Sequence, residues 1–245
     1  VALPAALKTS VLDTVDLRKK LSRQRYERAL ERYQAELREL EYQVFLQRVP
    51  VVIAYEGWDA AGKGGNIRRL TQRLDPRGYT VVPIAAPNDL ERAHHYLWRF
   101  WVQMPKAGHI VIFDRTWYGR VLVERVEGFC REDEWRRAYH EINAMEEHLT
   151  NFGAALFKFF LHISPEEQLR RFREREQTPH KQWKITEEDW RNRDKWHAYE
   201  MAAADMLENT STAYAPWVLV EANDKNWARI KAIKTWCEKL ELALE

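Results

Sequence analysis

The chain has 245 residues and 45% of them are hydrophobic, which is enough for one large domain with a substantial core. The 39 Lys and Arg residues nearly balance the 37 Asp and Glu residues, so the formal net charge is only +2. This balance does not indicate a nucleic-acid partner, and any anion site must come from local clustering of charge.

No apolar run reaches the length of a membrane span and no signal peptide is visible, so we expect no membrane partner. The two cysteines, Cys130 and Cys237, are typical of reduced thiols rather than of a disulfide framework. We therefore predict a cytoplasmic location.

The first 48 residues are predicted to form a helical extension. Between Asp13 and Gln47 the sequence is rich in Arg, Glu, Gln and Leu, and apolar residues recur at steps of three and four. This spacing places them on one face of a long helix. They are Tyr26, Leu30, Tyr33, Leu37, Leu40 and Val44. The apolar face could pack on the domain or pair with a second subunit, and the spacing leaves both interpretations open.

The stretch from Val51 to Gly65, VVIAYEGWDAAGKGG, has the pattern of a phosphate-binding loop. Its apolar run is too short for an independent helix and indicates a buried strand, after which the chain turns and a helical sequence begins. Gly57 to Lys63 satisfies the G-x-x-x-x-G-K part of the P-loop motif. Glycines let backbone N–H groups converge on an anion, the helix N-terminus adds partial positive charge, and Lys63 adds a full one.

Gly64 departs from this motif, because a P-loop continues with Ser or Thr, whose hydroxyl binds Mg²⁺. Glycine has no ligand to offer, and Asp59 inside the loop is a candidate to bind the metal or to position the nucleophile instead. The alternative is that GKGG is only a glycine-rich turn before a helix. The preceding strand and the flanking Asp and Lys favour the phosphate-binding loop.

The remaining chain alternates between short strands and helices. We predict strands over residues 79–85, 109–113, 155–163 and 217–222. Helices are predicted over residues 89–104 and 133–152, from the capping box at Ser164, over residues 186–210, and from about Asn226. This alternation predicts an α/β fold in three layers, with a five-stranded parallel sheet flanked by helices on both faces.

The strand at residues 109–113 runs directly into Asp114 and Arg115. A P-loop needs an acid from a neighbouring strand end, so we predict that Asp114 binds Mg²⁺, directly or through water, and that Arg115 faces phosphate. The alternative is that this Asp only caps a turn. Arg120 and Glu124 follow on a helix predicted over residues 119–128, four apart and so on one face. They could contact the acceptor nucleotide or form an ordinary surface ion pair.

A basic segment lies between Arg170 and Lys195, with nine Lys or Arg residues against six acids. Its middle, residues 178–184, lacks an apolar period and is predicted to be a loop that carries Lys181 and Lys184. We interpret residues 170–195 as a mobile lid that closes over phosphate and excludes water. For the arginines at its start, a solvated helix face is an equally weighted alternative.

The chain carries the motifs EGWDAAGKGG, FDRTWYGRVLVERVEGF, TPHKQWKIT and APWVLVEANDKNWARIK. Together they resemble the polyphosphate kinase 2 family, from about Tyr33 to Leu240, and the combination is far more specific than the P-loop alone. The resemblance implies a P-loop kinase fold similar to thymidylate kinase, with a helical lid. It also implies transfer of phosphoryl groups between inorganic polyphosphate and nucleotides, with Mg²⁺ as cofactor and Mn²⁺ able to substitute.

The resemblance places Asp59 and Lys63 in the Walker A site and Asp114 in the Walker B site, with Asp59 and Asp114 as metal ligands. Catalytic roles are expected for Asp59, Lys63, Asp114 and Arg115. The expected contacts to phosphate and polyphosphate are Ala61, Gly62, Lys63, Gly64, Gly65, Arg175, Lys181 and Lys184. The expected contacts to the nucleotide are Asp59, Arg115, Tyr118, Arg120 and Glu124.

Within the family, the wording IRRLTQRLDPRGY, IAAP and WYGRVLVERVEGF looks like the members that phosphorylate AMP. The expected reaction is reversible transfer of the terminal phosphoryl group of polyphosphate to AMP, with ADP or guanine nucleotides as further acceptors. The alternatives are a preference for nucleoside diphosphates, an ATP-dependent nucleotide kinase, and a phosphate-binding module without catalysis. A homo-oligomer, dimer or tetramer, is expected. Some AMP-acting members are tandem fusions, which leaves open whether this chain is half of a tandem-domain protein.

Overall fold

The computed structural model describes residues 10–245, so residues 1–9 of the predicted N-terminal extension lie outside the described residues. Five strands form a single parallel sheet in the order β2-β3-β1-β4-β5. They are β1 (Val51–Gly57), β2 (Tyr79–Pro83), β3 (Ile110–Asp114), β4 (Ala155–His162) and β5 (Trp217–Glu221). The predicted α/β fold with five parallel strands is confirmed.

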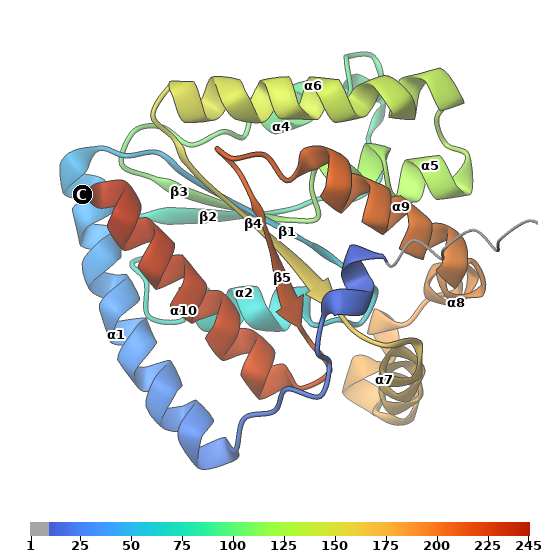
Figure 1. The fold of residues 1–245 in the computed structure, drawn as a ribbon, viewed down its shortest axis with the longest axis horizontal. Helices are drawn as coiled ribbons and strands as arrows, with labels where there is room; N and C mark the ends of the chain where they lie inside the picture. Colours follow the sequence, from blue (N-terminus) through green and yellow to red (C-terminus); the bar gives the residue numbers. More distant parts are fainter. Residues whose placement is uncertain (1–9) are drawn as a thin grey trace, which may run out of the picture.

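Helices form the other two layers. The α-helices of the described residues are α1 (Arg23–Gln47), α2 (Lys63–Thr71), α3 (Asp89–Arg92), α4 (Trp98–Trp101), α5 (Val123–Glu127), α6 (Glu132–Asn151), α7 (Pro165–Gln177), α8 (Glu187–Asp194), α9 (Trp196–Thr210) and α10 (Lys225–Leu244). The 3₁₀-helices are η1 (Val11–Thr14), η2 (Trp117–Arg120) and η3 (Pro179–Lys184). Helices α1, α2 and α10 lie on one side of the sheet and α6 and α9 on the other, while α7 and α8 lie beyond its carboxyl edge (Figure 1).

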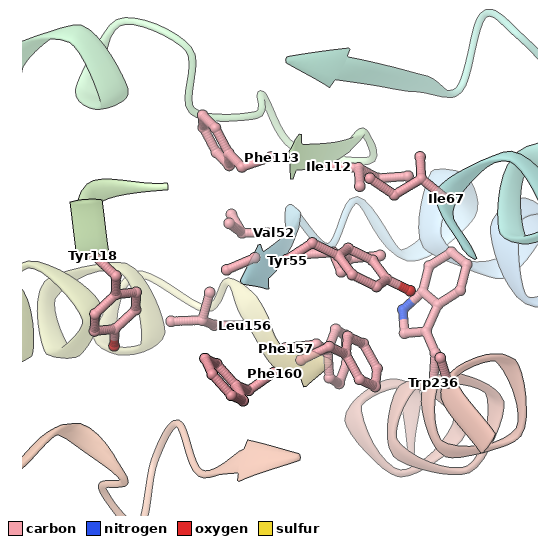
Figure 2. Close-up of a cluster of buried hydrophobic side chains, with 14 of the residues drawn as sticks. Val52, Tyr55, Ile67, Ile112, Phe113, Tyr118, Leu156, Phe157, Phe160 and Trp236 are labelled. Carbon is pink, nitrogen blue, oxygen red and sulfur yellow. The ribbon is translucent and has the colours of Figure 1, made fainter. Parts of the chain in front are cut away.

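The core occupies both faces of the central strand β1, whose residues from Val51 to Tyr55 have no exposed surface. Successive side chains of a strand point to opposite faces, so each strand contributes to both halves of the core. Figure 2 shows Tyr55 and Phe157 directed toward Trp236 of α10, whereas Leu156 points to the other face. Burial on both faces explains why these strands appear in the sequence as nearly continuous apolar runs.

The long helix α1 packs within the molecule. Leu37 and Val44 of its apolar stripe are each 1% exposed, and the helix lies along α10 and against α2. Gln34 adds a hydrogen bond from its Nε2 to the backbone carbonyl of Arg69 in α2, at 2.7 Å. Of the two interpretations of the stripe, the structure therefore supports packing on the domain.

Two helix predictions in the first half of the chain were too long. Helix α1 begins at Arg23 rather than near Asp13, because the Ser22 hydroxyl accepts a hydrogen bond from the first turn and caps it. Residues 89–104 form two short helices, α3 and α4, instead of one. The first of them ends at Arg92, and Asn88 caps it with a capping box that the apolar spacing did not reveal.

Three predictions in the second half also differ from the structure. The helix predicted over residues 119–128 is divided into η2 and α5, because Leu122 has non-helical backbone angles (φ −107°, ψ −98°). The helix predicted over residues 186–210 is broken at Lys195 into α8 and α9. The loop predicted over residues 178–184 is the 3₁₀-helix η3. Apolar spacing predicts that a helix is present, but it does not reveal a break of that helix at a single residue.

Two other sequence expectations concern membranes and cysteines. No helix within residues 10–245 combines the length and apolar character that crossing a bilayer requires. Cys130 is half-buried and Cys237 is buried, and both are free thiols. The two cysteines therefore form no disulfide with each other.

A buried ion pair joins β4 to α6. Lys158 Nζ lies 2.8 Å from Glu146 Oε2, and both side chains are fully buried. The ammonium also donates to the Tyr118 hydroxyl at 2.9 Å and to the Thr210 carbonyl at 2.7 Å. Glu146 Oε1 in turn accepts from the Tyr118 hydroxyl and from the Trp117 indole, at 2.6 and 3.1 Å.

Burial lowers the pKa of Lys158 and raises that of Glu146, and each partner's charge opposes the shift. The network fixes η2 to the core.

We expect Lys158→Met to lower the free energy of unfolding by about 3–5 kcal/mol, because it leaves the Glu146 carboxylate buried without its counter-charge. The control is Lys234→Met, whose partner Glu238 lies 3.5 Å away on the surface of α10, and which should cost less than about 1 kcal/mol. Urea unfolding measures both losses. A loss for Lys158→Met no larger than for the control would contradict this role of the ion pair.

Candidate active site

The loop between β1 and α2, residues 58–62, lies at the carboxyl edge of the sheet beside its central strand. Gly57 and Gly62 have φ angles of 137° and 103°, in the left-handed region that favours glycine. A Cβ at Gly57 would collide with the backbone carbonyl oxygen of Leu161 in β4. No side chain caps α2, which begins at Lys63, so its first backbone N–H groups remain available to an anion.

The side chain of Lys63 folds back over this loop. Its Nζ donates to the carbonyl oxygens of Gly57 and Trp58, at 2.7 and 3.2 Å. Burial lowers the pKa of Lys63, and the nearby carboxylates of Asp59 and Asp114 oppose that shift. An ammonium carries three protons, so Lys63 can hold the loop in shape and still donate to a phosphate oxygen.

Arg171 of α7 braces the loop from outside, a role that the sequence pattern does not reveal. Its side chain is 3% exposed. One terminal nitrogen donates to two carbonyl groups of the loop at 2.9 and 3.0 Å, and the other to the carbonyls of Ala222 and Asn223 at 2.6 and 3.0 Å. Its Nε donates to Glu167 at 2.6 Å. The spacing of Glu167 and Arg171 was visible in the sequence, but it is equally typical of a solvated helix face.

Asp114 stands beside the start of α2, because β3 pairs with β1 and places Asp114 opposite Tyr55. A Cβ built on Gly64 would lie 3.7 Å from Asp114 Oδ2, so the position at which a P-loop has Ser or Thr faces this carboxylate. Within the described residues, no three His, Cys, Asp or Glu side chains are grouped to hold a metal ion. Mg²⁺ usually binds one or two carboxylates and completes its shell with water and substrate phosphates, so Asp114 fits this ion.

Asp59 and Arg115 form an ion pair at the edge of the loop. Arg115 has a φ of 66°, which is uncommon for a residue other than glycine, and its guanidinium lies 3.3 Å from Asp59 Oδ1. Asn192 of α8 donates from Nδ2 to the other oxygen, Oδ2, at 3.0 Å. Both oxygens of Asp59 therefore have side-chain partners, which makes Asp114 the better placed of the two predicted metal ligands.

Glu56 fixes the turn that follows β3, and it too was not among the predicted site residues. Its Oε1 accepts from the backbone N–H of Thr116 at 2.7 Å and from the Thr116 hydroxyl at 2.9 Å. Burial raises the pKa of Glu56, and the charge of Lys63 opposes that shift. A signal was present in the sequence, because a carboxylate inside an apolar strand needs partners when it is buried.

Arg120 and Glu124 form an ion pair at 3.2 Å, with side chains that are 16% and 28% exposed, and their contact with a nucleotide stays a prediction. The Arg120 guanidinium also lies over the ring of Tyr96, 4.4 Å from its centroid. Tyr118 lies elsewhere: its side chain is fully buried and its hydroxyl is bound within the Lys158 network. The prediction that Tyr118 contacts the nucleotide is therefore corrected, because its ring points into the core.

The residues of the predicted lid lie on α7, η3 and α8, beyond the carboxyl edge of the sheet (Figure 1). Lys181 pairs with Glu174 at 2.7 Å, and Arg175 donates to the backbone carbonyl of Lys184 at 3.0 Å. Lys184 is exposed, and its Nζ lies 5.0 Å from the ring centroid of Trp183. Two of the three predicted lid cations are thus bound to groups within the lid itself, and closure over phosphate stays a prediction.

A central parallel strand, a glycine loop, a lysine at the start of a helix and an acid at the end of the neighbouring strand together form a phosphate-binding site of the P-loop class. Gly64 sets this site apart from the common motif, which has Ser or Thr at this position, and it faces the Asp114 carboxylate. The model of the family Polyphosphate kinase 2 matches residues 20–245, and the chain belongs to this family.

Individual relatives agree with this assignment. The chain is 54% identical over 234 residues to the polyphosphate:AMP phosphotransferase of Pseudomonas syringae pv. tomato, covering 96% of this chain and 47% of the relative. It is 45% identical to the ADP-polyphosphate phosphotransferase of Pseudomonas aeruginosa, covering 87% of this chain and 70% of the relative. The crystal structure of polyphosphate kinase 2 from Arthrobacter aurescens TC1 matches with a TM-score of 0.91 at 32% identity, covering 97% of this chain and 87% of that one. The chain spans about half the length of the polyphosphate:AMP phosphotransferases that it matches.

We expect Gly57→Ala to lower the free energy of unfolding by about 2–4 kcal/mol, because its methyl group would collide with the backbone of β4 and its φ is strained for alanine. Gly64→Ala is the matched control, since its Cβ meets Asp114 at an ordinary contact distance and alanine favours a helix. Guanidinium unfolding compares the two variants. Equal stability would refute the close approach of β1 to β4 at Gly57.

Proposed function

We propose that this domain transfers the terminal phosphoryl group of inorganic polyphosphate to AMP. The observation that carries the proposal is a P-loop site whose Gly64 faces Asp114, in a chain that is 54% identical to a polyphosphate:AMP phosphotransferase. The proposal concerns the domain alone, because the chain spans about half the length of that relative.

In this reaction an oxygen of the AMP phosphate attacks the terminal phosphorus of polyphosphate in line. A P–O bond forms to AMP and gives ADP, while the bond to the next phosphate breaks and leaves the chain one unit shorter. Charge is spread over the transferring oxygens, so catalysis rests on positioning and on neutralising cations. Lys63 and the first N–H groups of α2 would hold the transferring group, and Arg115 would contact it from the end of β3.

Asp114 would hold Mg²⁺ together with water and substrate phosphate, with Asp59 as a second candidate ligand. When bound, the ion supplies positive charge that neutralises the phosphate oxygens. The chain's own part is to place Asp114 beside the loop, which the pairing of β3 with β1 does. Gly64 leaves room between that carboxylate and the start of α2.

The partly exposed pair of Arg120 and Glu124 is proposed to contact the acceptor nucleotide. A monophosphate carries little charge, so its recognition depends on such shape-specific contacts. The second candidate function is phosphorylation of nucleoside diphosphates, which is favoured by 45% identity to an ADP-polyphosphate phosphotransferase and 39% to a GDP-polyphosphate phosphotransferase. An ordinary ATP-dependent kinase is disfavoured, because Gly64 lacks the hydroxyl of the common motif.

The test is product analysis by anion-exchange chromatography after incubation with polyphosphate and MgCl₂ but no ATP. AMP, ADP, GMP and GDP are supplied in separate reactions, and we expect AMP to be the fastest acceptor. Lys63→Ala should lower kcat by ~10³-fold, because it removes a charge at the transferring phosphate. The control variant Lys20→Ala alters an exposed lysine outside the site and should keep full activity.

Each outcome of this test decides between named alternatives. ADP formed only when ATP is added would overturn polyphosphate as the donor. Faster turnover of ADP or GDP would replace the AMP proposal with the second candidate. Near-normal turnover by a folded Lys63→Ala protein would refute the P-loop assignment.

Asp114→Asn tests the proposed metal ligand, because it keeps the shape of the side chain and removes its charge. We expect the Mg²⁺ concentration at half-maximal rate to rise by about tenfold or more, with a lower maximal rate. Asp89→Asn is the matched control at a fully exposed position. If the rates of wild type and Asp114→Asn depend on MgCl₂ concentration in the same way, Asp114 only caps a turn.

A further inference from the structure

A chain of polar contacts runs from the end of α5 across the lid to Asp59. It begins at Glu127, whose side chain is only 4% exposed. Its Oε2 accepts from Lys195 Nζ at 2.8 Å and lies 3.3 Å from Arg191 Nε. Arg191 and Lys195 stand on either side of Asn192, so Glu127 holds the end of α8 at two points. Helices α5, α8 and α9 lie together at one end of the molecule (Figure 1).

Tyr199 of α9 connects this anchor to Asn192. Its hydroxyl lies 3.3 Å from Glu127 Oε1 and 3.1 Å from Asn192 Oδ1, and it has one proton to donate to either. Burial raises the pKa of Tyr199, and the carboxylates of Glu127 and Asp59 raise it further, so the hydroxyl stays protonated. It therefore remains a donor across the working pH range of an enzyme.

The orientation of the Asn192 amide follows from its two neighbours. An ionised carboxylate only accepts hydrogen bonds, so the group facing Asp59 must be the amide nitrogen, which donates to Oδ2 at 3.0 Å. The amide oxygen then faces Tyr199, whose hydroxyl can donate its one proton to it across the shorter of its two contacts, 3.1 Å against 3.3 Å. Arg115 holds the other oxygen of Asp59 at 3.3 Å. The Asp59 carboxylate is thus fixed from two sides by side chains of different elements.

Three further contacts hold the same junction together. Gln168 Nε2 donates to the backbone carbonyl of Asp59 at 3.1 Å. The ring of Trp58 stacks on that of Trp196, the first residue of α9, with centroids 3.9 Å apart and an interplanar angle of 10°. The Trp58 indole donates to His162 Nδ1 at 2.8 Å, and burial lowers the pKa of His162 to about 4, which keeps this nitrogen an acceptor at neutral pH.

We infer that Asn192 and Tyr199 are positioning residues that fix the carboxylate of Asp59 for phosphoryl transfer, with Glu127 as their anchor. The inference rests on the proposed function for its kinetic readout. Neither residue touches the transferring phosphoryl group, and both act through Asp59. Because α8 belongs to the predicted lid, the orientation of Asp59 depends on the lid being in the position seen here.

Three variants separate a positioning role from simple packing. Asn192→Ala removes the donor and should lower kcat by ~10-fold, with the KM values for AMP and polyphosphate within about threefold of wild type. Asn192→Asp has nearly the same shape but sets a carboxylate against Asp59, and should lower kcat by ~100-fold. Tyr199→Phe keeps the ring and loses only the hydroxyl, and should resemble Asn192→Ala.

Tyr214→Phe is the matched control, because Tyr214 is 37% exposed and its hydroxyl donates to the Asn143 carbonyl outside the site, at 2.9 Å. It should leave kcat unchanged. A packing role would give the reverse order, with the isosteric Asn192→Asp milder than Asn192→Ala. That order, or wild-type kcat in Asn192→Ala, would overturn the inference.

Hydrogen exchange of the unliganded proteins tests the same contacts without any activity. Peptides covering residues 187–194 should exchange about tenfold faster in Tyr199→Phe and Asn192→Ala than in Tyr214→Phe, because α8 loses its link to the loop. Unchanged exchange in both variants would refute the contacts themselves. If the wild-type protein transfers no phosphoryl group from polyphosphate but the variants show this exchange pattern, the proposed function is refuted and the positioning of Asp59 stays supported.

Discussion

The shape of the site depends on the hydrogen bonds that the guanidinium of Arg171 donates. A guanidinium presents its donors in a rigid planar fork, so the four carbonyl groups that it binds cannot move independently of one another. Two of them belong to the P-loop and two to the connection between β5 and α10. Arg171 itself sits on α7. One side chain therefore ties three segments of the chain into a single rigid support, behind the loop that Lys63 and the N-terminus of α2 complete.

The strand order distributes the site between two sides of the central strand. β1 separates β3 from β4, so the loop that follows β1 stands at the point where connections leave the sheet in opposite directions. Asp114 ends β3 and Arg115 and Arg120 follow it on one side, whereas α7 and α8 follow β4 on the other. The groups proposed for the acceptor and those of the lid therefore follow different strands.

The sequence predicted those parts of the protein that depend on local patterns. The strands were predictable because burial on both faces requires nearly continuous apolar runs. Lys63 and Asp114 were predictable because the motif places a lysine at the start of the helix after the loop and an acid at the end of a neighbouring strand. Tyr118 was misplaced because proximity in sequence to Asp114 does not tell where a ring points, and here the buried charges of Lys158 and Glu146 draw its hydroxyl inward.

The roles of Arg171, Glu56 and Asn192 were beyond a single sequence. Their partners in the site are 111, 60 and 133 positions away, and no local pattern encodes contacts over such separations. Glu56 came nearest to being predictable, since a carboxylate in an apolar strand signals a missing partner. That the partner of Glu56 is Thr116 became known only from the structure of the turn after β3.

The stacked rings of Trp58 and Trp196 have a consequence for the energetics of movement. Trp58 is 7% exposed, and one of its faces is covered by an indole that belongs to the segment following the lid. Any displacement of α8 and α9 from the loop must first part the two rings and wet both apolar faces, at a free-energy cost set by the area uncovered. Movement of α8 and α9 away from the loop therefore requires work, and the stacked rings oppose it.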